Sequence, residues 1–213
     1  VSPPWPREFP EELGVHGFEG MAKGQVPSGY GLEELQKAAL KLAPYALVSP
    51  LFFTCEAWDT LPPQEQKSCG WSSLERFAPR AWRRPLSEEE TDGLQVFWEE
   101  NWENATPEQA VVLTVAGLLQ APAFLFRLET GEETPDGGNI RHLTGWEMAA
   151  KLSYFLWDSM PDQSLFLAAA QDQLKTPEGI ESQARRMLED PRARSMVICL
   201  LYTSPSPRDN TLS

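Results

Sequence analysis

Residues that titrate near neutral pH are scarce in this sequence, which has two histidines, His16 and His142, among its 213 residues. Histidine is the commonest general acid or base of enzymes. Both histidines fall in loop-like segments, where we expect solvated side chains. The spacings CxxC, CxxCH and HExxH are also missing, and with them the usual metal and covalent haem sites. We therefore predict no catalytic residue, no metal ligand and no cofactor-binding residue in this chain.

Long apolar runs and an excess of basic residues are missing as well. No apolar run approaches the roughly 18 residues that a membrane helix needs. The chain has 18 Lys and Arg against 31 Asp and Glu, a formal net charge of −13. Such a charge repels phosphate backbones and anionic membrane surfaces. We expect a soluble chain with no nucleic-acid partner and no membrane insertion.

Strand patterns are nearly absent, whereas apolar residues recur at helical spacing from Leu32 onward. The sequence predicts an all-α fold, with about seven helices in two packed groups after an irregular N-terminal segment rich in Pro and Gly. The predicted helices cover 32–46 (divided by Pro44), 71–81, 87–102, 106–121, 144–156 and 176–188, with a further helix through Leu165 and Ala169, and residues 49–69 are predicted to be a connection. Capping boxes begin three of the helices, at Ser87, Thr106 and Thr144.

The helical pattern divides into two parts. We predict a helical domain over 63–130 and a second, truncated helical domain over 140–198, separated by the loop 131–139. The predicted core contains Trp82, Phe97, Trp98, Leu118, Phe124, Leu152, Phe155 and Trp157.

Residues 199–209, CLLYTSPSPRD, resemble the translated frame of an adapter oligonucleotide used in sequencing libraries. We therefore expect 199–213 to be an artefactual tail, with natural sequence ending near Ile198. The start at Val1 lacks an initiator Met, so we expect any signal peptide to lie upstream. Without the tail, Cys55 and Cys69 remain, and from the residues alone a disulfide and two free thiols are equally open.

Two groups of residues could form a binding surface. Trp98 and Trp102 lie one helical turn apart and could stack on sugar rings, although such pairs are more often core. Glu99, Glu100 and Glu103 could supply paired carboxylates for glycoside chemistry, although adjacent acids on a helix mostly form a solvated face.

A basic cluster at Arg80, Arg83 and Arg84 precedes the acids 88–90. We expect an interdomain ion-pair cluster there, with pairing to nearby acids as the simpler alternative.

The segment RAWRRPLSEEE, 80–90, followed by LLQAPAFLFRLE, 118–129, resembles a bacterial family of unknown function numbered 1595, first grouped in planctomycete proteins. LTGWEMAAKLSYFLWDSMPD, 143–162, and LEDPRARSMV, 188–197, resemble the start of family 1592. Residues 10–43 resemble more weakly the end of family 1587, which would make 1–62 an irregular lead-in plus one helix at the end of an upstream domain.

Proteins with this set of domains are commonly large and exported, and often carry modules like c-type cytochromes. The resemblance therefore implies an extracytoplasmic, helical scaffold region whose partners are other domains of the same polypeptide. Haem c would belong to other parts of that polypeptide. Export would favour the Cys55–Cys69 disulfide. The alternative is part of an extracytoplasmic enzyme or carbohydrate-binding protein that acts on polymers.

Overall fold

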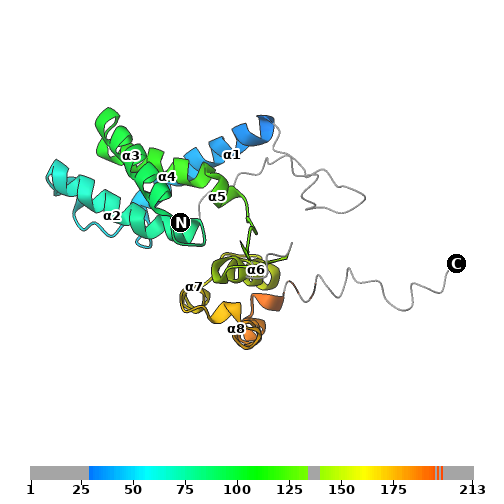
Figure 1. Cartoon of the computed structure of the whole chain (residues 1–213). Coiled ribbons are helices and arrows are strands. Elements are labelled where there is room, and N and C mark those ends of the chain that lie inside the picture. Colours follow the sequence, from blue (N-terminus) through cyan, green and yellow to red (C-terminus); the bar gives the residue numbers. More distant parts are fainter. Residues whose placement is uncertain (1–28, 134–139, 195, 197, 199–213) are drawn as a thin grey trace, which may run out of the picture. The chain divides into compact units, whose positions relative to one another are not determined.

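The computed structural model describes residues 29–133, 140–194, 196 and 198, and within them the fold is all-α, as predicted. These residues contain eight α-helices, three short 3-10 helices and a single antiparallel pair of two-residue strands. They divide into two compact units after Phe126 (Figure 1). None of the described helices is both long enough and apolar enough to cross a membrane.

The first unit runs from the start of the described residues to Phe126. Its elements are α1 (Gly29–Leu42), η1 (Ala43–Val48), η2 (Trp58–Thr60), α2 (Pro63–Ala81), α3 (Glu88–Asn104), α4 (Pro107–Gln120) and α5 (Pro122–Leu125). The second unit begins at Arg127. Its elements are β1 (Glu132–Glu133), β2 (Arg141–His142), α6 (Gly145–Trp157), α7 (Gln163–Ala170), η3 (Gln173–Lys175) and α8 (Pro177–Glu189).

The three predicted capping boxes are confirmed, at the starts of α3, α4 and α6. In each box a Ser or Thr side chain accepts from the backbone N–H three residues later, and the Glu or Gln there accepts from the first residue's N–H. Together they satisfy two of the four N–H groups that a helix start leaves without partners. Local sequence therefore determines where these helices begin.

Helix α4 is the central element of the first unit and packs on α1, η1, α2 and α3. Its sequence is apolar on most of its circumference, which is typical of a helix covered by neighbours. Val111, Val115 and Leu118 of α4 are buried with Trp98 of α3 and Leu74 of α2. The same core includes Ala39 and Ala43, so it joins residues on both sides of the predicted domain boundary after residue 62.

The prediction of a connection over residues 49–69 was wrong for its last seven residues. Helix α2 begins at Pro63, so Cys69 lies on a helix rather than in a loop. Pro63 occupies the first helical position, where its missing N–H costs nothing. The first turns, 64–68, are mostly polar and solvent-facing, with Gln66 as the buried exception, and so show no apolar periodicity.

The second unit packs α6 against α7, η3 and α8. Gly145, Ala149, Ser153 and Leu156 form the buried stripe of α6, at spacings of three and four residues. Trp157 closes this core by donating its indole N–H to the carbonyl of Met187, 3.0 Å away.

The predicted core residues differ in their outcome. Trp98, Leu118 and Trp157 are buried, and Trp82, Phe124 and Leu152 are half-buried. Two predictions were wrong. Phe97 is 38% exposed because its ring covers Gly117, which has no side chain to enclose it. Phe155 is 60% exposed because it lies about 100° around the helix from Leu156 and about 160° from Ser153, both of which belong to the buried stripe.

Candidate functional site

A disulfide links the irregular segment that follows η1 to helix α2. Cys55, in the segment that follows η1, is joined by a disulfide to Cys69 on α2, and their Cα atoms are 6.0 Å apart. This separation lies within the range of about 4.4–6.8 Å that such bonds span. The hydroxyl of the buried Ser73 lies 3.8 Å from the Sγ of Cys55 and donates to the carbonyl of Cys69.

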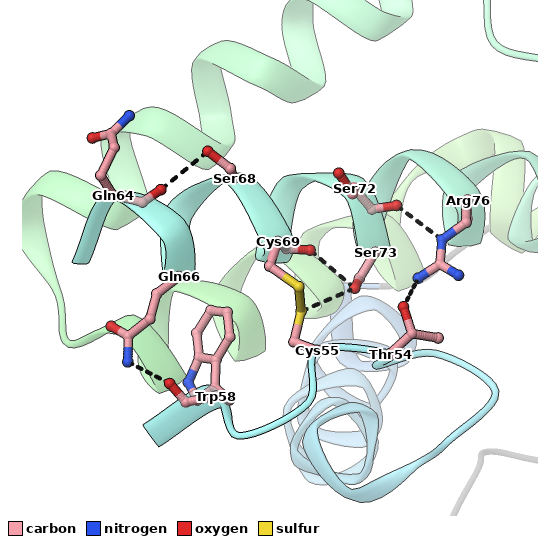
Figure 2. Close-up of a disulfide and its surroundings, with 10 residues drawn as sticks. All are labelled: Thr54, Cys55, Trp58, Gln64, Gln66, Ser68, Cys69, Ser72, Ser73 and Arg76. Carbon is pink, nitrogen blue, oxygen red and sulfur yellow. Dashed lines mark hydrogen bonds between the residues drawn. A yellow bond between two sulfur atoms is a disulfide. The ribbon is translucent and has the colours of Figure 1, made fainter. Parts of the chain in front are cut away.

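Two further contacts hold the segment 49–62 against α2 (Figure 2). Gln66 donates its side-chain amide to the carbonyl of Trp58, 2.8 Å away, and Arg76 donates to the hydroxyl of Thr54. The disulfide lies between these two contacts along α2. The segment is therefore fixed along about three turns of the helix, from Gln66 to Arg76, and Trp58 is carried into the core.

Trp58, Trp98 and Trp102 form an aromatic cluster beneath this segment. The ring centroids of Trp98 and Trp102 are 5.2 Å apart, and those of Trp58 and Trp102 are 6.4 Å apart with the rings nearly perpendicular. Gly70 of α2 makes the close approach possible, because a Cβ there would lie 2.8 Å from the Trp98 ring and 3.3 Å from the Trp58 ring. The packing of Trp98 and Trp102 therefore favours the interpretation that they belong to the core over the interpretation that they stack on sugar rings.

The three candidate acids of α3 are largely solvent-facing. Glu100 and Glu103 are exposed and Glu99 is half-exposed. Trp98 belongs to the buried core and Trp102 packs against it, whereas these carboxylates are not part of that core. Among the described residues, no three His, Cys, Asp or Glu side chains are grouped closely enough to hold a metal ion.

One of the two histidines lies in the described part of the chain. His142 is exposed on β2, where its backbone pairs with Glu132. His16 lies outside the described residues.

Arg83 ends α2 in a Schellman motif, with its backbone in the left-handed conformation at φ 60°. The N–H of Arg84 donates to the carbonyl of Pro79, and the N–H of Arg83 donates to that of Arg80. Glycine usually occupies this position because a side chain there costs about 1 kcal/mol or more. The Arg83 side chain has a use that glycine could not supply.

The Arg83 side chain is buried, and its Nη2 donates toward three main-chain carbonyls of the segment that follows α4. The acceptor oxygens of Ala123, Phe124 and Phe126 lie 2.7, 2.9 and 3.2 Å away. These bonds fasten the end of the first unit to the end of α2. We refer to Arg83 and its three acceptors as the arginine clamp.

The other two arginines of the basic cluster have different surroundings. Arg84 forms a bidentate pair with Glu90, at 2.7 Å for each bond, so for this residue the simpler alternative of pairing with a nearby acid applies. Arg80 is exposed. The arginine clamp and the Arg84–Glu90 pair both lie within the first unit, and an interdomain role for the three arginines stays a prediction.

The Arg84–Glu90 pair makes the stability of the first unit depend on pH. Its hydrogen bond from Arg84 is the largest cause that lowers the pKa of Glu90 from 4.5 to about 2. Because the folded pKa is depressed, the stabilisation is present above pH 4.5 and is lost as the pH falls toward 2.

We expect Arg84→Gln to reduce the unfolding free energy by about 1 kcal/mol at pH 7, since both side chains are partly solvent-screened. The difference from the parent chain should shrink between pH 4.5 and 2, as measured by urea denaturation. Arg185→Gln on α8 is the control, because its exposed pair with Glu181 should contribute no more than about 0.5 kcal/mol. A difference that stays constant down to pH 2 would contradict the assignment to Glu90.

Glu147 has two roles at the start of α6. Its Oε2 accepts from the N–H of Thr144 in the capping box. Its Oε1 accepts from the N–H groups of Thr130 and Gly131, at 2.7 and 3.0 Å, and from the Thr130 hydroxyl. Burial raises the pKa of Glu147, but the N–H donors of Thr144, Gly131 and Thr130 outweigh it, so the pKa lies below 4.5. We refer to these bonds to 130–131 as the glutamate clamp.

Two family models match the chain. Residues 69–129 match "PSD5: Protein of unknown function (DUF1595)", and residues 143–201 match "PSD4: Protein of unknown function (DUF1592)". The predicted resemblance to families 1595 and 1592 is thereby confirmed, whereas family 1587 has no match over residues 10–43. No curated protein and no solved structure matches significantly.

The two matches follow the division of the structure. The DUF1595 match begins at the disulfide cysteine of α2 and ends at Glu129, just beyond the arginine clamp. The DUF1592 match begins beside the capping box of α6 and runs to residue 201, three residues beyond the predicted end of natural sequence. Neither model description assigns a function.

Three structural roles were missed by the sequence analysis. The arginine clamp has no local signal, because its acceptors lie 40 or more residues away. Trp58 was not predicted to be buried, because it lies in a segment without periodicity. The capping box predicted the hydrogen-bond partner of one carboxylate oxygen of Glu147, but nothing in the sequence indicated what the other oxygen binds.

Proposed function

We propose that the chain is a non-catalytic helical scaffold region of a large exported protein that carries a c-type cytochrome-like redox module elsewhere in its polypeptide. The observation that carries the proposal is the use of its described tryptophans. Every tryptophan among the described residues is buried or half-buried. The side chains best suited to recognise a ligand are therefore occupied in packing.

The strongest polar groups are used in the same way. The arginine clamp binds main-chain carbonyls, and the glutamate clamp binds main-chain amides. A buried charge that is satisfied by fixed backbone groups serves to hold the chain in one conformation. Such bonds suit a part whose task is to position other domains.

The disulfide supports the proposed location outside the cytoplasm. Disulfides persist in oxidising compartments and are rare where thiol reductants are abundant. The Cys55–Cys69 bond is half-buried beside the aromatic cluster rather than exposed in a mobile turn. The cytochrome-like module is proposed from the resemblance to families 1595 and 1592 alone.

The alternative of an enzyme or carbohydrate-binding protein has less support. Stacking on a sugar ring needs an exposed aromatic face, and Trp98 and Trp102 face each other and Trp58 instead. Of the three candidate carboxylates on α3, Glu100 and Glu103 are exposed and Glu99 is half-exposed.

The proposal is tested on the full-length gene and its product. We expect a signal peptide and at least one CxxCH motif, and a haem-staining band of full-length size in the extracytoplasmic fraction of cells that mature c-type cytochromes. The present chain, expressed alone in the same cells, should give no haem stain. A parent protein that stays in the cytoplasm with Cys55 and Cys69 as free thiols would overturn the proposal, as would retention of the isolated chain on insoluble polysaccharides.

A further inference from the structure

The two clamps hold the two ends of one short stretch of chain. The arginine clamp ends at the carbonyl of Phe126, and the glutamate clamp begins at the N–H of Thr130. Only Arg127, Leu128 and Glu129 lie between them. Four Cα–Cα steps separate Phe126 from Thr130, so the clamped ends can lie at most about 14 Å apart.

The backbone between the clamps lacks the bonds that hold its neighbours. The N–H of Phe126 donates to Pro122, and those of Thr130 and Gly131 donate to Glu147. Within the described residues, the N–H groups of 127–129 have no hydrogen-bond acceptor. Bonds from the backbone N–H groups therefore do not fix these three residues.

Side chains of the same three residues make two contacts with α6. The guanidinium of Arg127 lies 4.4 Å from the ring centroid of Tyr154, and Glu129 pairs with Lys151 at 2.7 Å. Glu147, Lys151 and Tyr154 are spaced by four and three residues, so they share one face of α6. The chain from 127 to 131 follows this face in order, from Tyr154 back to Glu147.

We propose that Arg127–Glu129 is a latched hinge between the two units. The clamps fix its ends, and the Arg127–Tyr154 and Glu129–Lys151 contacts are latches that close it along α6. Both latches are electrostatic contacts in which the charged residues, Arg127, Glu129 and Lys151, are exposed, so salt screens them and each is individually weak. The clamps are partly buried and persist when the latches open. The proposed hinge rests on contacts inside each unit. It goes beyond the scaffold role, because these contacts do not depend on whether the parent protein is exported.

Hydrogen exchange of the full chain, followed by NMR, tests where the hinge lies. We expect the amides of Leu128 and Glu129 to exchange at least about tenfold faster than those of Phe126, Thr130 and Gly131. If the amides of Leu128 and Glu129 are as well protected from exchange as that of Phe126, the hinge is overturned. Glu147→Ala should raise the exchange rates of 130 and 131 and leave that of Phe126 unchanged.

Electron-spin distance measurements on the full chain test the latches. Labels carried by non-natural residues at the exposed positions Glu75 of α2 and Ser182 of α8 report one unit each. Arg127→Ala with Lys151→Ala should reduce the ratio of latched to open molecules about tenfold and broaden the distance distribution. Arg185→Ala, which removes an exposed arginine away from the hinge, should leave the distribution unchanged.

Salt gives a second readout that needs no latch variant. Raising NaCl from about 0.05 to about 0.5 M should broaden the distribution of the parent chain, because the Debye length falls from roughly 14 Å to roughly 4 Å. The double variant should not respond. A parent distribution that neither salt nor the double substitution changes would overturn the latches, even if the scaffold function holds.

Discussion

Replacing Trp98 with Ala should destabilise the first unit by about 3–5 kcal/mol, the usual cost of removing a large aromatic side chain from a core. Trp98 is 1% exposed, and its ring fills the space beside Gly70 where α2 and α3 meet. No neighbour can fill the vacated volume, because Gly70 has no side chain and Trp102 is already held against Trp58. The measurement is chemical denaturation followed by near-ultraviolet circular dichroism.

Two companion variants separate volume from polarity. Trp98→Phe should cost less than about half as much, since a ring remains and the buried indole N–H, which has no acceptor among the described residues, is removed. Val96→Ala, at an exposed position of the same helix, should change the unfolding free energy by less than about 0.5 kcal/mol. A loss below about 1 kcal/mol for Trp98→Ala would show that the aromatic cluster is not the core of this unit.

The starts of the capped helices and the fold class could be predicted because their causes are local. A capping box places both of its hydrogen bonds within four residues, and the boxes at Ser87, Thr106 and Thr144 all form as predicted. Pro44 also acts locally: α1 ends at Leu42 and continues as a 3-10 helix. The all-α class follows from the sum of such signals.

Burial could be predicted only in part, because it depends on what lies opposite each helix. Phe97 and Trp98 were both predicted to be in the core, yet Phe97 faces Gly117 and remains partly exposed. Phe155 belongs to an apolar stripe with Met148 and Leu152, but the packed stripe of α6 is the one formed by small residues. Small residues allow neighbouring helices to approach closely. A search for large apolar side chains at helical spacing does not detect a stripe of this kind.

The residues of the clamps could not have been predicted from spacing. Arg83 binds carbonyls about 40 positions away, and its left-handed backbone would have suggested glycine at that position. For the two cysteines, the residues alone did not decide between a disulfide and two free thiols. The expectation of export favoured the disulfide, and the structure joins Cys55 to Cys69.

Loss of the Cys55–Cys69 bond should lower the unfolding free energy of the first unit by about 3 kcal/mol, on the chain-entropy estimate for a loop of about 15 residues. The cysteines are 14 positions apart, and the loop they close carries Trp58 into the aromatic cluster. Without the bond, the unfolded chain gains freedom. The folded chain keeps only the Gln66 and Arg76 contacts to hold the segment on α2.

Cys55→Ser with Cys69→Ser, compared with the parent chain by urea denaturation, measures this effect. A dithiol reductant should destabilise the parent to a similar extent and leave the double variant unchanged, which excludes a contribution from Cys199. Tryptophan fluorescence should shift to longer wavelength on reduction if Trp58 leaves the core. Because Trp58 packs edge-on against Trp102, its release should also weaken the response of the unit to Trp98→Ala. Strictly additive losses for the two changes would mean that the bond stabilises the chain without holding the aromatic cluster.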